Sequence, residues 1–118
     1  MEMIQGDRRT DRRYDMQLKL HYRLMKGSRV LHEGTGITRN MSRGGIQFEA
    51  DRSLQSGSLV ELSIEWPIPL RGRTPIRLHV MGYVTRSCRK VVALHSTWHE
   101  FVAAAVERQP EPQAALAI

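Results

Sequence analysis

The sequence predicts a mainly β protein, a six-stranded antiparallel β-barrel with one C-terminal α-helix. Apolar and polar residues alternate along six short segments, which is the period of strands with one buried face and one wet face. Turn-forming residues separate these segments at hairpin-like spacing. Only one segment, near the C-terminus, repeats its apolar residues at helical spacing, so no crossover helices are expected and the sheet is predicted to be antiparallel.

The alternation is clearest between Met16 and Leu24, where every second residue is apolar. Residues 26–28 are typical of a hairpin turn, and Gly34 and Gly36 in the returning strand suggest a β-bulge or a bend of the barrel wall. The six predicted strands comprise residues 16–24, 29–38, 46–50, 59–66, 77–85 and 91–96, with loops over 51–58 and 67–75.

The predicted helix spans residues 98–108 and packs on the barrel. Thr97 is a suitable N-cap, and Glu100 three residues later completes a capping box. The residues at helical spacing are Trp98, Phe101, Val102, Ala105 and Val106. We expect one domain over residues 7–108, a lead-in of residues 1–6 and a tail of residues 109–118.

Charge and cysteine content limit the possible partners. The net charge is +6, from 18 Lys and Arg against 12 Asp and Glu, which favours anionic partners. Cys88 is the only cysteine, so the chain forms no internal disulfide and no cysteine-based zinc site. No apolar run approaches the roughly 18 residues of a membrane span, so we expect a cytoplasmic protein without membrane insertion.

Two polar segments are candidates for binding. Residues 7–13 contain four arginines, and the spacing of Arg9 and Arg13, like that of Arg8 and Arg12, allows a pair to clamp one anion. The plainer interpretation of such a pair is a solvated charge run.

The second segment is residues 40–45. Asn40 and Ser42 lie on the same side of an extended backbone, and Gly44 and Gly45 permit a positive φ or the close approach of a flat ligand. The plainer interpretation here is an ordinary turn, in which Asn40 and Ser42 bond to their own backbone.

Together the two segments make the chain resemble a PilZ domain, the bacterial receptor module for the second messenger cyclic di-GMP, over roughly residues 7–106. The family motif R-x-x-x-R matches Arg9 to Arg13, and the motif [D/N]-x-S-x-x-G matches Asn40 to Gly45. The resemblance implies a six-stranded barrel that acts as a signalling receptor or adaptor for a protein partner, without cofactor, metal or catalytic residue. The ligand-binding residues it implies are Arg8, Arg9, Arg13, Asn40, Ser42, Gly44 and Gly45.

The sequence departs from the family pattern in two places. Asn40 stands where an acid is more usual, which removes a carboxylate acceptor for guanine N–H groups. Residues 91–96 lack the glycine and the aromatic residue that many members carry in the last strand. The arginines nevertheless suit the ligand, because a guanidinium can hold a phosphate with two bonds or stack on a purine. We expect the arm to be loose without ligand and to close over it.

Three alternatives stay open. A small basic barrel can bind single-stranded nucleic acid, although most of the seven aromatic residues are expected to face the core. An enzyme is disfavoured, because the five histidines are scattered and form no metal or triad spacing. A PilZ-like domain that has lost its ligand and serves protein interaction is the third.

Overall fold

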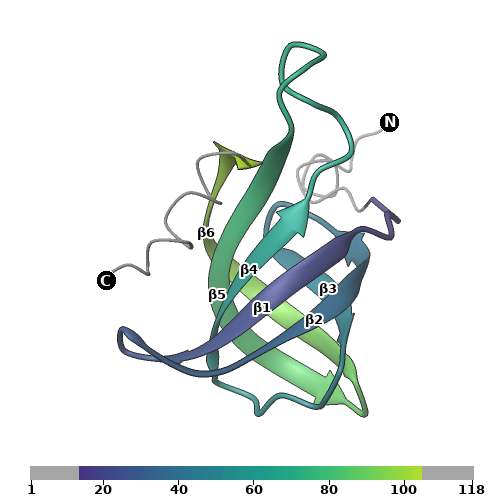
Figure 1. Ribbon diagram of the computed structural model, residues 1–118. Helices are drawn as coiled ribbons and strands as arrows, with labels where there is room; N and C mark the ends of the chain where they lie inside the picture. Colours follow the sequence, from purple (N-terminus) through teal and green to yellow (C-terminus); the bar gives the residue numbers. More distant parts are fainter. Residues whose placement is uncertain (1–13, 105–118) are drawn as a thin grey trace.

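The computed structural model describes residues 14–104, which form a closed barrel of six antiparallel strands (Figure 1). Around the barrel the order is β1, β2, β3, β6, β5, β4, and β4 pairs with β1. The predicted six-stranded antiparallel barrel is therefore confirmed. The strands are β1 (Lys19–Lys26), β2 (Arg29–Met41), β3 (Gly45–Ala50), β4 (Leu59–Glu65), β5 (Ile76–Cys88) and β6 (Val91–Ala103).

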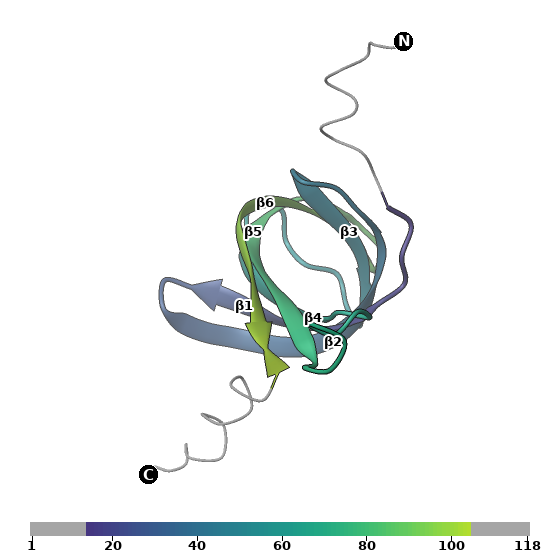
Figure 2. The ribbon, with the colours of Figure 1, turned by 90° about the horizontal axis from the view of Figure 1, so that it is seen from above.

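One connection crosses the barrel instead of joining neighbouring strands. β3 lies between β2 and β6, whereas β4 lies between β1 and β5, so residues 51–58 pass from one side of the ring to the other (Figure 2). Leu54 on this loop is 3% exposed, and its backbone N–H donates to the Ser87 hydroxyl at 3.3 Å. The crossing loop thus adds an apolar side chain to the core.

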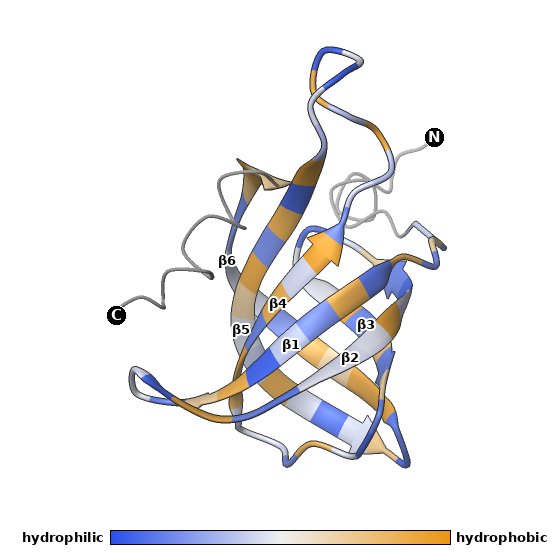
Figure 3. Ribbon diagram, viewed as in Figure 1, coloured by the Kyte–Doolittle hydropathy of each residue, from blue (hydrophilic) through white to orange (hydrophobic). Residues whose placement is uncertain are grey.

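The core consists of the apolar half of each alternating strand. Tyr22, Phe48, Val60, Ile64 and Val92 are fully buried. Figure 3 shows the resulting alternation of hydrophobic and hydrophilic positions along the strands. Because successive side chains of a strand point to opposite faces, the polar residues between them cover the outside of the barrel.

The predicted helix over residues 98–108 is wrong where the structure describes it, because β6 continues as a strand to Ala103. Trp98 pairs with Met81 of β5. β5 is 13 residues long, as β6 is, and it offers this half of β6 a hydrogen-bonding partner. The Thr97 hydroxyl does not cap a helix but donates to the Met81 carbonyl at 3.2 Å. The end of the predicted helix lies outside the described residues. Among residues 14–104, no helix has the length and apolar character needed to cross a membrane.

Of the two expectations for Gly34 and Gly36, a β-bulge or a bend, the β-bulge is wrong, since the pairing with β1 is uninterrupted through both residues. These positions lack room for a side chain. A Cβ on Gly34 would lie 2.6 Å from the Tyr22 hydroxyl, and one on Gly36 would collide with the Glu49 carbonyl. Against β3, β2 changes register at Arg39 instead, and this change shapes the candidate site.

Candidate functional site

The predicted segment of residues 40–45 contains the hairpin turn between β2 and β3, together with the last two residues of β2 and the first of β3. Met41 pairs with Ile46, and the Ser42 N–H donates to the Gly45 carbonyl at 2.8 Å. The Ser42 hydroxyl also points to this carbonyl, but at 3.4 Å, which is a weak contact. A turn in which Ser42 bonds to the backbone is therefore present, and its half-buried hydroxyl is held only weakly.

A register change places Asn40 on the outside of the barrel. Thr38 pairs with Phe48 and Asn40 pairs with Gln47, so Arg39 is an extra residue in β2. Strict alternation would put Asn40 on the same face as the fully buried Thr38. The extra residue turns both Arg39 and Asn40 outward. Their contacts show this, because Arg39 Nη1 forms an ion pair with Glu49 Oε1 at 3.5 Å, and the Asn40 amide nitrogen donates to the Gln47 side-chain oxygen at 2.9 Å.

The chain enters the barrel beside this turn. Tyr14 forms an isolated β-bridge with Met41, in which its N–H donates to the Met41 carbonyl at 2.7 Å and its carbonyl accepts from the Met41 N–H at 3.0 Å. Met41 stands between Asn40 and Ser42. Thr38 of β2 holds the residues that follow Tyr14, since the Thr38 hydroxyl donates to the Met16 carbonyl. The predicted arm residues Arg8, Arg9, Arg12 and Arg13 lie outside the described residues.

The two glycines of the turn differ in their surroundings. Neither has the positive φ that their sequence suggested. A Cβ on Gly45 would lie 2.9 Å from the Leu94 carbonyl of β6, so this glycine is needed where β3 and β6 approach closely. A Cβ on Gly44 would meet no atom within 4 Å among the described residues. Among the described residues, Gly44 is therefore the glycine of this segment with open space beside it.

Two further residues, Gln47 and His95, lie beside this segment because of strand pairing. Gln47 bonds Asn40, and His95 of β6 pairs with Gly45 on one side and with Tyr83 of β5 on the other. The alternation of β3 does assign Gln47 to the outer face. Its pairing with Asn40 depends on the extra residue in β2, which no feature of the sequence revealed.

The aromatic residues are more exposed than the sequence suggested. Tyr14, Tyr83, Trp98 and Phe101 are each about half exposed, so most aromatics do not face the core. The rings of Phe101 and Trp66 pack edge to face, with their centroids 5.1 Å apart. The expectation of few exposed aromatic platforms is therefore wrong.

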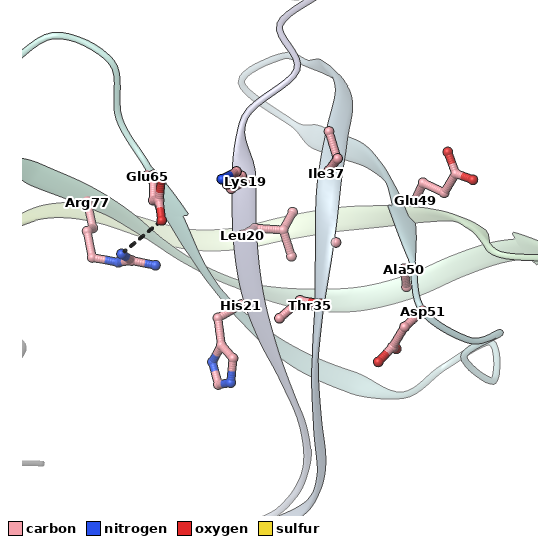
Figure 4. A pocket seen from close by; sticks show the side chains of 11 residues that line it. Lys19, Leu20, His21, Thr35, Ile37, Glu49, Ala50, Asp51, Glu65 and Arg77 are labelled. Carbon is pink, nitrogen blue, oxygen red and sulfur yellow. Dashed lines mark ion pairs between the residues drawn. The ribbon is translucent and has the colours of Figure 1, made fainter.

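A hollow of about 540 Å³ lies away from the turn, along β1 and β2 (Figure 4). It contains none of the predicted site residues. Polar side chains around it have partners: Arg77 Nη1 is 3.9 Å from Glu65 Oε2, and His21 Nε2 is 3.1 Å from Glu33 Oε1 beside the hollow. Within the described part of the chain, no group of three His, Cys, Asp or Glu side chains is arranged to hold a metal ion.

Asp51, also on this hollow, has a structural partner. The Tyr22 hydroxyl donates to the Asp51 carboxylate at 2.5 Å. Burial, and then this hydrogen bond, raise the pKa of Tyr22 well above its ordinary value. The same hydrogen bond is the main reason that the pKa of Asp51 is lowered. The pair joins the end of β3 to the middle of β1.

Comparison with known families places most of the chain in one family. The family model described as PilZ domain matches residues 7–95, a range that contains both the arginine arm and the β2–β3 turn and ends at the residue paired with Gly45. No curated protein and no solved structure matches the chain. PilZ domains typically bind cyclic di-GMP and are in general non-catalytic receptors. The match covers most of the chain, so this protein belongs to the PilZ domain family.

Proposed function

We propose that this protein binds cyclic di-GMP at the β2–β3 turn and passes the signal to a protein partner as a cytoplasmic receptor or adaptor. The arm supplies Arg8, Arg9 and Arg13, and the turn supplies Asn40, Ser42 and the backbone of Gly44 and Gly45. The observation that carries the proposal is the bridge between Tyr14 and Met41, because it joins the end of the arm to the centre of the second motif.

The bridge limits how far the arm can lie from the turn. Arg13 is covalently joined to Tyr14, so their Cα atoms are about 3.8 Å apart. Arg9 precedes Arg13 by four residue-to-residue steps, each of at most about 3.6 Å. Arg13 therefore lies close enough for its side chain to reach a ligand seated on the turn, and Arg9 can reach the same ligand if the arm folds back over the turn.

The chemistry of the two segments is complementary. Guanidinium groups can hold the phosphates with paired hydrogen bonds and can stack on guanine or contact its O6 and N7 atoms. Asn40 on β2 and Ser42 in the turn offer hydrogen bonds to a base edge. Ordering of the arm over the ligand would change the surface that a partner meets, which is how binding becomes a signal.

Calorimetric titration with cyclic di-GMP tests the proposal, with GTP and cyclic di-AMP as controls. Arg13→Lys keeps the charge but loses the planar fork, so we expect it to weaken binding nearly as much as Arg13→Ala, by about 1.5–3 kcal/mol. Arg9 should behave in the same way. If the arm were only a general basic patch, Arg→Lys variants would bind cyclic di-GMP like the parent. Replacement of Arg8, Arg9, Arg12 or Arg13 by Ala would then reduce the affinity by about the same amount in each case.

The same titration, with melting curves, distinguishes the role of Gly44 from that of Gly45. Gly44→Ala adds a methyl group to open space, so it should leave the melting temperature unchanged and weaken ligand binding. Gly45→Ala places its Cβ against the Leu94 carbonyl, so it should lower the melting temperature as well. A Gly44→Ala protein that binds like the parent would remove the turn backbone from the site.

Single-stranded nucleic acid is the second candidate ligand, favoured by the exposed rings of Tyr83 and Trp98 on a basic protein. Such binding depends steeply on salt, because Lys and Arg release counterions from the phosphates. A fluorescent oligonucleotide titrated at several salt concentrations distinguishes the two functions. Tight oligonucleotide binding at physiological salt, without cyclic di-GMP binding, would favour this candidate.

A further inference from the structure

Asn40 forms a side-chain hydrogen bond with a neighbour that belongs to neither motif. Its amide nitrogen donates to the Gln47 side-chain oxygen at 2.9 Å. The other end of the Asn40 amide, Oδ1, is an acceptor. Among residues 14–104, no group donates a hydrogen bond to this oxygen. The pair therefore leaves an acceptor available at the first position of the motif.

The orientation matters because an amide has two different ends. A carboxylate at this position accepts hydrogen bonds through both oxygens, whereas Asn40 accepts through Oδ1 and donates through its nitrogen. The edge of guanine that carries the N2 amino group offers donors. An Asn40 amide turned the other way would set donor against donor and would leave polar groups unpaired.

We propose that Gln47 is a positioning residue for ligand recognition: it binds the Asn40 nitrogen and so directs Oδ1 toward the guanine donors. This inference rests on the proposed function. With Gln47 in place, the amide presents an acceptor where the family more often has an acid. Gln47 compensates for that replacement.

The surroundings of Asn40 and Gln47 favour a hydrogen bond between these two side chains. Gln47 and Asn40 are direct cross-strand partners on the outer face, a relationship that brings Cβ atoms to about 4.5–5.5 Å. On its other side Gln47 pairs with Ala93, whose methyl side chain offers no competing hydrogen bond. Both Gln47 and Asn40 are partly buried, which restricts their alternative rotamers.

A double-mutant cycle tests the inference with four proteins: the parent, Gln47→Met, Asn40→Asp and the double variant. Methionine has nearly the size of glutamine but cannot fix the amide. With Asn40 present, Gln47→Met should weaken cyclic di-GMP binding about fivefold, the scale of one net hydrogen bond. With Asp at position 40, where either oxygen accepts, the same change should cost less than about twofold.

Melting curves and a matched control complete the experiment. Gln55→Met changes an exposed glutamine on the crossing loop and should leave affinity within about twofold of the parent. Equal losses from Gln47→Met in both backgrounds would show a merely structural role and overturn the inference, as would no loss in either. A parent protein that does not bind cyclic di-GMP would instead overturn the proposed function itself.

Discussion

At the scale of single residues, the best-defined interaction outside the site joins a buried hydroxyl to an exposed carboxylate. Tyr22 is fully buried and donates to Asp51, which lies just beyond β3. The hydrogen bond favours the ionised carboxylate, so the pKa of Asp51 in the folded protein is below its unfolded value. The stability that this contributes is present above the unfolded pKa and is lost as the pH falls through the folded pKa.

Tyr22→Phe should therefore have a pH-dependent effect on stability. At pH 7 we expect the free energy of unfolding to fall by about 1 kcal/mol, because the variant lacks one hydrogen bond. Below about pH 4, the ordinary range of an aspartate, the difference between the two proteins should shrink as Asp51 becomes protonated. Urea unfolding at several pH values measures this, and a constant difference down to pH 2 would contradict the assigned partner.

Residues of the candidate site could be predicted where they belong to a sequence motif. They could not be predicted where their position depends on the register between two strands. The motif predicts Asn40, Ser42 and Gly45 as site residues, and the structure places them at and beside one hairpin turn, whereas their binding of a ligand stays a prediction. The role of Gln47 depends on the extra residue at Arg39, which has no distinctive local sequence. Bulges arise from the pairing of two strands, so a single strand pattern does not reveal them.

At the scale of elements, the end of β6 shows how two periodicities compete. Trp98, Phe101 and Val102 satisfy helical spacing, whereas Trp98, Glu100 and Val102 also share one face of a strand. The deciding factor is nonlocal: β5 extends alongside, and its residues from Ile76 to Met81 pair with this half of β6. Tertiary pairing outweighed local helix preference.

The strand assignment changes the expected importance of Trp98. It is 46% exposed, whereas Phe48 is fully buried in the barrel. Phe48→Ala should lower the free energy of unfolding by about 3–5 kcal/mol, because it leaves a cavity in the core. Trp98→Ala should cost only about 1 kcal/mol, since water can occupy the vacated space. Denaturant unfolding compares them, and a larger loss for Trp98→Ala would indicate that a further element covers this side chain.

At the scale of the whole molecule, the closed barrel separates stability from ligand binding. Among the described residues, the buried core is formed by side chains between Leu20 and Leu94. The arginines proposed to bind ligand all precede it in the chain. A change in the arm should therefore alter binding while the unliganded barrel keeps its stability.

Thermal unfolding with and without cyclic di-GMP tests this separation. A ligand at 100 times its dissociation constant stabilises the folded state by about 2.7 kcal/mol, which corresponds to a rise of roughly 10 °C in melting temperature. At that same concentration, Arg13→Ala, with its affinity reduced tenfold or more, should gain about 1.4 kcal/mol or less. Without ligand, Arg13→Ala and the parent should melt together. A lower melting temperature for the unliganded variant would mean that Arg13 supports the barrel itself, and an equal rise with GTP would mean that the site reads phosphate charge and not the cyclic dinucleotide.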